Sequence, residues 1–380
     1  MISSIFDPYK ADIVFVGGGP VALWTAINTK MQNSKLKIVV LEKYTEYKRI
    51  HNLFIESASL KTDISSPLLD GLIRELKKHK VISTMTLESK LAELAEKVGV
   101  AILKNREISN PKEDLKPFTL AKVIVGADGA HSIMRQQVTG EDAVKSFLYQ
   151  KELHYIADLT YPEVKSPIGF FEKISVNSAV GNFIYEIHSN KAKKTTLRTF
   201  IDAHSFAKMK QATRKTPENV YSDVVVETVR QEFLRFLKTK YGSKLDDFID
   251  LKAATVTTTM LGTYISKKMV KHENGQTWCL VGDAAFGVPF FKSLNNGLVS
   301  GTRLAKIIAA SFEEKEEKIF SSLNEDHSFE KYESFMHRFA KWQVRIADVK
   351  SFGVNSWIKI AKMFQGFYGP SIYLEAAAPE

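Results

Sequence analysis

A glycine-rich turn between an apolar strand and a helix constrains the fold of this chain more than any other feature. Residues 11–16 are mostly apolar and β-branched, which predicts a buried strand, and residues 21–31 have an apolar face with helical spacing. The tight turn between them lets a pyrophosphate approach the backbone, and the free N–H groups at the helix start would face the phosphates. The residues predicted to form this nucleotide site are Gly17, Gly19, Pro20, Val21 and Ala22, the last in the place of a third glycine.

An acidic residue follows the next predicted strand at the spacing of a dinucleotide site. Residues 37–41 form that strand, and Glu42 lies 23 residues after Gly19. A carboxylate near this position binds the ribose hydroxyls of the adenosine half, and we expect Glu42, with Lys43 beside it, to do so. Because an acid repels a 2′-phosphate, the site suits FAD or NAD better than NADP.

Two further strand–turn segments each place an aspartate after an apolar strand. Strand 121–125 runs into Gly126-Ala-Asp-Gly129, where Asp128 can orient the turn, and Arg135 follows on a helix. Strand 277–281 leads to Asp283, which can accept a hydrogen bond from a ribityl hydroxyl or act as an ordinary helix cap.

The late motif continues into a helix that opens with Asn295-Asn-Gly297. The N-terminus of this helix would point at an electron-rich group, such as the pyrimidine edge of a reduced flavin. Any one of the three motifs alone is consistent with a common turn. All three in this order favour a single FAD bound along one chain.

The motifs and their spacing resemble those of the group A flavoprotein monooxygenases, the para-hydroxybenzoate hydroxylase type. The resemblance covers roughly residues 10–60, 80–140 and 250–310. It implies an α/β fold, in which a Rossmann-like FAD-binding domain of the glutathione-reductase type contains an inserted antiparallel-sheet substrate domain and precedes a helical C-terminus.

The resemblance also implies roles for residues near the flavin. Asp128 and Arg135 would contact FAD and, indirectly, the pyridine nucleotide, while Asp283 would bind the ribityl chain. Residues 288–291, with Pro289, look like the same stretch in kynurenine 3-monooxygenases. Lys292-Ser-Leu-Asn295 resembles the Lys-Gly-Leu-Asn flavin loop, so the backbone N–H groups near Leu294 and Asn295 would face the flavin N1–C2 carbonyl.

Two cations are the candidate catalytic residues. Lys292 would either lie beside N1–C2 of the flavin or point to solvent. Tyr47-Lys-Arg49 resembles the aromatic-x-Arg segment of the MICAL-type monooxygenases, which would place Arg49 near the flavin or the pyrophosphate. No metal ion is expected.

Four positions depart from the family pattern. Met85 stands where the family often has an arginine, and Phe286 where a histidine commonly follows Gly-Asp-Ala-Ala. Phe291 and Ser293 replace small residues in the flavin loop. These changes bear on the geometry of the flavin more than on its binding.

The chain alternates between two kinds of pattern. We predict a discontinuous FAD-binding domain over residues 1–147 and 251–325, a β-rich substrate domain over 148–250, and a helical segment over 326–380. Period-two alternation within 153–202 predicts strands, and residues 217–238 predict one long helix.

Charge and cysteine content bear on partners and location. The net charge of +10 attracts anions, but the lysine clusters lack interleaved aromatic residues, so nucleic acid is not an expected partner. The basic, aromatic segment 358–368 is consistent with peripheral membrane or acidic-partner contact, or with packing on its own core. One cysteine, Cys279, and no visible signal peptide lead us to expect a reducing, cytoplasmic location.

The leading functional prediction is an FAD-dependent monooxygenase that uses NADH or NADPH and O2 to hydroxylate an aromatic or apolar small molecule. The alternatives are a reductase like the geranylgeranyl reductases, a non-catalytic binding protein like the GDI and Rab escort proteins, and a MICAL-like oxidase of a protein substrate. Halogenation is disfavoured because the four tryptophans are isolated and form no Trp-x-Trp motif.

Overall fold

The chain forms two compact units in the computed structural model, which describes residues 6–46, 52–79, 81–162, 174–179, 182–189, 194–289, 292–312, 328–364 and 375–376. The first unit comprises Met1–Lys151 and Thr263–Ala347, and the second Glu152–Gly262 and Asp348–Glu380. The first unit therefore contains all three glycine motifs.

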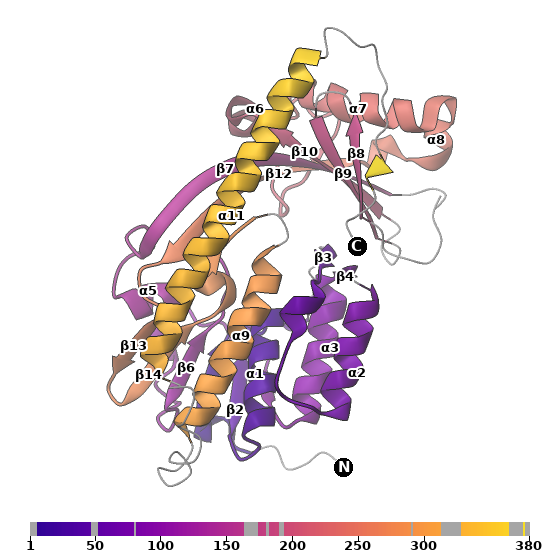
Figure 1. Ribbon diagram of the computed structural model, residues 1–380. Coiled ribbons are helices and arrows are strands. Elements are labelled where there is room, and N and C mark those ends of the chain that lie inside the picture. Colours follow the sequence, from indigo (N-terminus) through magenta and orange to yellow (C-terminus); the bar gives the residue numbers. More distant parts are fainter. Residues whose placement is uncertain are drawn as a thin grey trace. The chain divides into compact units, whose positions relative to one another are not determined.

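A mostly parallel sheet forms the centre of the first unit (Figure 1). Its strands, in spatial order, are β13 (Val270–Glu273), β14 (Gln276–Leu280), β6 (Val123–Gly126), β1 (Ile13–Val16), β2 (Ile38–Leu41) and β5 (Ala101–Leu103). β1 and β2 are buried along their whole length, as strands covered on both faces are. The antiparallel edge strand β13 reaches β14 through Asn274 and Gly275, both at positive φ, which suits a two-residue hairpin.

The first unit also contains helices and short elements outside this sheet. The helices are α1 (Pro20–Gln32), α2 (Pro67–His79), α3 (Thr84–Lys97), α4 (Pro111–Asp114), α5 (Ile133–Thr139), α9 (Lys292–Ser311) and the start of α11 (Phe329–Phe364). The short elements are the strands β3 (Asn52–Phe54), β4 (Val81–Ser83) and β15 (Phe286–Gly287), and the 3-10 turns η1 (Pro8–Lys10), η2 (Ser57–Leu60) and η5 (Gly282–Ala284).

Glycines allow α9 to cross α1 at close range. A Cβ on Gly297 would lie 2.4 Å from Cγ2 of Val21, and one on Gly301 would lie 2.4 Å from Oγ1 of Thr25. Trp24, fully buried in α1, donates its indole N–H to the Thr302 hydroxyl of α9 at 2.9 Å. The helix that follows the first motif is thereby fixed to the helix that follows the third.

The close contact between Gly297 and Val21 can be tested by one substitution and a second that should reverse part of its effect. Gly297→Ala is expected to lower the free energy of unfolding by about 1–3 kcal/mol, because Val21 is β-branched and its χ1 is stiff within a helix. Adding Val21→Ala removes the opposing methyl groups and should restore part of the loss. Urea denaturation of the wild type, Gly297→Ala and the double variant measures both effects, and a double variant no more stable than Gly297→Ala would contradict the packing.

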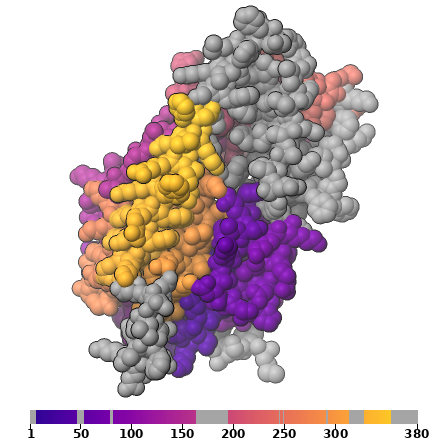
Figure 2. Space-filling view, in the orientation of Figure 1, coloured from indigo at the N-terminus to yellow at the C-terminus, as the bar shows by residue number. Residues whose placement is uncertain are grey.

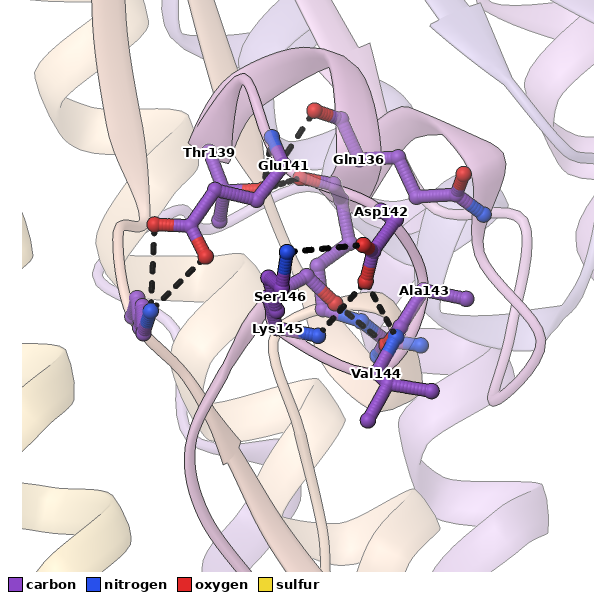
Figure 3. A network of polar contacts seen from close by, with 10 residues as sticks. Gln136, Thr139, Glu141, Asp142, Ala143, Val144, Lys145 and Ser146 are labelled. Carbon is purple, nitrogen blue, oxygen red and sulfur yellow. Dashed lines mark hydrogen bonds and ion pairs between the residues drawn. The ribbon is translucent and has the colours of Figure 1, made fainter.

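A polar network lies where the chain leaves the first unit and returns to it (Figure 3). Lys267 Nζ bonds both carboxylate oxygens of Glu141, at 3.0 and 2.7 Å, and the Lys267 backbone N–H donates to the Ser146 carbonyl at 2.9 Å. Asp142 accepts from the backbone N–H groups of Val144 and Lys145 and so holds the turn before β7. The outgoing and returning segments are thus joined before the second unit begins.

The second unit is built on an antiparallel sheet. Its strands are β7 (Phe147–Pro162), β8 (Ile174–Ala179), β9 (Asn182–Ser189), β10 (Lys194–Ile201), β11 (Glu218–Asn219), β12 (Thr255–Ser266) and β16 (Glu375–Ala376). Its helices are α6 (Ala203–Lys208), α7 (Glu227–Tyr241) and α8 (Leu245–Phe248), with the 3-10 turns η3 (Gly242–Lys244) and η4 (Leu251–Ala253). Side chains of α7, among them Phe233 and Leu237, pack with Leu159 and Leu197 of the sheet in a separate core.

The antiparallel strands and the helical end of the chain agree with the prediction, but one helix boundary was wrong. The helix predicted over 217–238 begins at Glu227, because the preceding residues form β11 and a turn. Asn219 accepts from the Tyr221 backbone N–H, and the Arg230 guanidinium bonds three carbonyls of this turn.

The predicted domain bounds stay a prediction. The two compact units meet after Lys151, after Gly262 within β12, and after Ala347 within α11, whereas the predicted bounds lie at 147, 250 and 325.

Candidate functional site

The first motif forms a turn that requires glycine at two positions. Gly17 has φ +102°, and a Cβ there would lie 2.5 Å from the Ala127 carbonyl oxygen of the second motif. A Cβ on Gly18, whose role the sequence analysis missed, would lie 2.8 Å from a carboxylate oxygen of Glu42. Gly19 differs from both, because a Cβ there would meet open space.

The helix start next to Gly19 is ready to bind an anion. Gly19 is the N-cap of α1, and no described side chain caps this helix end. Pro20 occupies the first helical position and has no N–H, so the donors of the first turn are those of Val21 and Ala22. Open space beside an uncapped helix N-terminus fits a pyrophosphate.

Glu42 lies against the glycine turn, and its predicted role toward the ribose stays a prediction. Its side chain is 3% exposed and accepts from the backbone N–H of Gly18 at 2.8 Å and of Tyr44 at 2.9 Å. Each carboxylate oxygen has a second lone pair that a ribose hydroxyl can use. Lys43 is exposed, and its ammonium lies 4.9 Å from the ring centroid of Tyr44.

Asp128 organises the second motif through hydrogen bonds. It accepts from the Ser132 hydroxyl at 2.5 Å and from the backbone N–H groups of Ile133 and Met134 at 2.8 and 3.2 Å. Burial raises the pKa of the Asp128 carboxyl, and these hydrogen bonds oppose that rise. The predicted orienting role is confirmed; its role toward FAD stays a prediction.

Arg135 connects the second motif to the third. Its guanidinium donates to the carbonyls of Ala284 at 3.1 Å and Ala130 at 2.6 Å, and lies 4.3 and 5.2 Å from the ring centroids of Phe147 and Tyr264. Burial lowers the pKa of this guanidinium, whose ordinary value is so high that it stays charged.

Tyr264 supports the same turn from β12. Burial raises the pKa of the Tyr264 phenol, so the hydroxyl keeps its proton and donates to the Asp283 carbonyl at 2.8 Å. Gly287 leaves room for the Tyr264 ring, since a Cβ there would lie 2.4 Å from it. Tyr264 could not be predicted from the sequence, because it belongs to none of the three motifs.

The third motif also touches the first. Gly282 has φ +62°, and a Cβ there would lie 3.0 Å from Cγ1 of Val21 in the first turn of α1. The half-buried Asp283 follows directly, at the end of the sheet where β1, β2, β6 and β14 terminate. Motifs far apart in the sequence therefore meet at the carboxyl edge of one parallel sheet, where such folds bind ligands.

The first turn of α9 is fastened to the segment after β3. The Asn295 side chain, 2% exposed, donates to the Phe54 carbonyl at 2.9 Å and accepts from the Glu56 backbone N–H and the Ser59 hydroxyl, both at 2.8 Å. Lys292 forms an ion pair with Glu56, so it does not simply point to solvent. Sequence analysis missed Glu56 and Ser59 because their partners lie more than 230 residues away in the chain.

Two of the four positions that depart from the family pattern, Ser293 and Phe286, make defined contacts within the protein. The Ser293 hydroxyl donates to the Val288 carbonyl at 2.9 Å and so closes the loop in which Pro289 is buried. Phe286 is buried edge-on against Phe339 of α11. Leu294 is half-buried against the core. Arg49 and Phe291 lie outside the described residues.

One buried polar group near this turn has no protein partner. Asn296 is 5% exposed, and its Nδ2 makes no hydrogen bond among the residues that the structure describes. A buried amide that is left unsatisfied costs free energy, which a bound ligand could offset. With the open space at Gly19, this fits a polar cofactor along the sheet edge.

The fold is similar to that of solved flavin-dependent enzymes. P. aeruginosa PqsL matches with a TM-score of 0.58 and 13% identity over 93% of this chain and 99% of its own. The flavin-dependent halogenase CmlS matches with a TM-score of 0.57 and 11% identity, covering 87% of this chain, which spans only 62% of that protein. The peptidyl tryptophan dihydroxylase QhpG matches with 0.55 and 13% identity over 91% and 75%.

These likenesses confirm the inferred resemblance for the fold. At such low identity they bear on the fold alone. No protein-family model matches the sequence, and no curated protein matches it significantly. Within the residues that the structure describes, no helix is long and apolar enough to cross a membrane.

Proposed function

We propose that this chain is an FAD-dependent monooxygenase that uses NADH or NADPH and O2 to hydroxylate an aromatic or apolar small molecule. The observation that supports it most is the mutual contact of the three motifs. Gly17 abuts Ala127, Gly282 abuts Val21, and Arg135 bonds the third motif to the second. A similar fold in flavin-dependent enzymes agrees with this proposal.

The first two motifs would hold the ADP half of FAD. The N–H groups of Val21 and Ala22 would donate to the pyrophosphate beside Gly19, and the Glu42 carboxylate would accept from the ribose hydroxyls. Asp128 and Arg135 would act by fixing the turns that line this path rather than by reaching the cofactor themselves, since their polar atoms mostly bond protein groups.

The third motif would hold the flavin half. Asp283 would accept from the ribityl hydroxyls, the Asn296 amide would donate to the cofactor, and the backbone N–H groups of Leu294 and Asn295 would face the N1–C2 carbonyl. Bound FAD would supply the redox chemistry, taking two electrons from NADH or NADPH and delivering them to O2. The chain's part is to orient the ring and exclude water.

Lys292 and Glu56 allow a test with effects of opposite sign. Lys292→Met should lower the flavin midpoint potential, by about 30 mV if the lost stabilisation is near 1.4 kcal/mol, and slow reduction by the pyridine nucleotide, because a cation near N1–C2 stabilises the reduced ring. Glu56→Gln removes the counter-ion of Lys292 and should raise the potential. Potentiometric titration and stopped-flow reduction measure both.

The sign difference separates electrostatics from general damage to the site. If both variants shift the potential in the same direction, loss of the ion pair has perturbed the loop, and Lys292 is not the cation that acts on the flavin. An unchanged reduction rate in Lys292→Met would also remove it from the mechanism.

The reaction class is tested by oxygen labelling. Stopped-flow reduction with NADH and NADPH, with and without candidate aromatic compounds, should reveal substrate-stimulated reduction, and the product should contain one atom from ¹⁸O2. Flavin reduction coupled to saturation of a lipid double bond, with no label, would instead support the reductase alternative. A protein that cannot be reconstituted with FAD would support the non-catalytic alternative.

A further inference from the structure

Helix α11 exposes three large apolar side chains along one line. Trp342, Val349 and Phe352 are 60%, 71% and 74% exposed. At about 100° per residue they fall within about 80° of one another around the helix axis. The opposite side of the helix is buried in the core of the first unit through residues such as Met336, Ala340 and Val344. The apolar stripe is therefore additional to the face that packs.

Cations share the exposed stripe. Arg338, Lys341 and Arg345 are exposed and lie with the apolar three in an arc about 100° wide and about 21 Å long. That arc contains no acidic residue, and the half-buried Asp348 lies just outside it.

The two acidic residues nearest the start of α11, Glu330 and Glu333, bond groups of β13 and the segment before it. Glu333 accepts from the backbone N–H groups of Met269 and Val270, and Glu330 pairs with His272. The charges of the helix are thus segregated, with cations and large apolar groups together on its exposed side. Figure 2 shows part of α11, in yellow, at the surface.

We propose that this face of α11, from Arg338 to Phe352, docks on the surface of an anionic phospholipid bilayer. Aromatic and aliphatic side chains flanked by arginine and lysine are the composition of helices that lie in a membrane interface. Each cation near an anionic surface strengthens binding by about fivefold at moderate ionic strength. A second copy of this chain is a poorer occupant, because its own α11 would bring three cations against three cations.

This inference goes beyond the proposed oxidation and does not depend on it, since the six side chains need no cofactor. It also differs from the expectation for segment 358–368, whose side chains lie outside the described part of the chain. Because all six side chains are exposed, their replacement should leave the core intact.

The test is co-flotation of the full chain with vesicles of phosphatidylcholine containing about one third phosphatidylserine, against vesicles of phosphatidylcholine alone. Binding is expected only with phosphatidylserine. It should weaken steeply as the salt concentration rises to about 0.5 M, because salt screens the attraction between the cations and the lipid head groups. Trp342→Ser with Phe352→Ser, and Arg338→Glu with Arg345→Glu, should each weaken binding about tenfold or more.

Matched controls use exposed residues elsewhere on the chain. Leu120→Ser with Val144→Ser likewise replaces two exposed apolar side chains, and Lys35→Glu with Lys37→Glu makes the same change in net charge. Both controls should bind like the wild type, and melting curves should confirm that all variants fold. No binding to phosphatidylserine vesicles, or equal losses in the controls, would overturn the proposal. Self-association of the wild type that Trp342→Ser abolishes would overturn it in favour of a second copy.

Discussion

Gly17→Ala is expected to lower the free energy of unfolding by about 3 kcal/mol or more, even without FAD. Two costs add at this position. Gly17 has φ +102°, a conformation that residues with a Cβ rarely adopt, and the new methyl group would lie 2.5 Å from the backbone oxygen of Ala127. Backbone between β1 and β6 cannot shift without disturbing the sheet, so the clash cannot be relieved by a rotamer change.

Gly19→Ala is the matched control, two residues away in the same turn. Its Cβ would meet open space, and Gly19 has φ −71°, so stability without FAD should stay within about 1 kcal/mol of the wild type. The same methyl group would stand where the pyrophosphate approaches, so FAD affinity should fall about tenfold or more. Urea denaturation and FAD titration separate the two effects. A stable Gly17→Ala protein, or unchanged FAD affinity in Gly19→Ala, would contradict the assigned roles.

Arg135→Leu is expected to cost about 3–5 kcal/mol of stability. The substitution removes charge-assisted hydrogen bonds to the carbonyls of Ala130 and Ala284, and it leaves the buried Ala284 carbonyl without this donor. It also removes the cation that lies over the rings of Phe147 and Tyr264. The turn that holds Asp283 should loosen, so FAD affinity should fall with stability.

Arg135→Lys and Arg106→Leu serve as comparisons. Lysine keeps the charge but lacks the planar guanidinium that reaches two carbonyls at once. Arg135→Lys should therefore recover less than half of the free energy of unfolding that Arg135→Leu loses. Arg106 is exposed and donates to the Tyr9 hydroxyl, so its replacement should cost less than about 1 kcal/mol. Urea denaturation of apoprotein measures all three. If Arg135→Leu costs no more than Arg106→Leu, the guanidinium does not fasten the motifs together.

The local parts of this site could be predicted from the sequence. β1, the turn at Gly17 and α1 follow from apolar periodicity and a glycine signal within about 20 residues, and β6 and β14 follow in the same way. The position of Glu42 against the turn also followed, because β1 and β2 are adjacent parallel strands and a single helix connects them.

The side-chain partners could not be predicted in this way. Asn295 was expected to serve through its backbone, but its side chain bonds Phe54, Glu56 and Ser59, which no local pattern connects with it. The sequence does not distinguish a Lys292 beside the flavin from one in solvent, and its pairing with Glu56 depends on tertiary folding. The predicted helix start at residue 217 was wrong, because turn hydrogen bonds outweigh helical periodicity in residues 217–226, and α7 begins only at Glu227.

Titration of the purified apoprotein with FAD tests the central claim most directly. We predict saturable binding of one FAD per chain, with a flavin absorbance band that shifts on binding and a rise in melting temperature at excess FAD. A wild-type chain that is folded by circular dichroism, yet neither retains nor takes up FAD, would contradict the account.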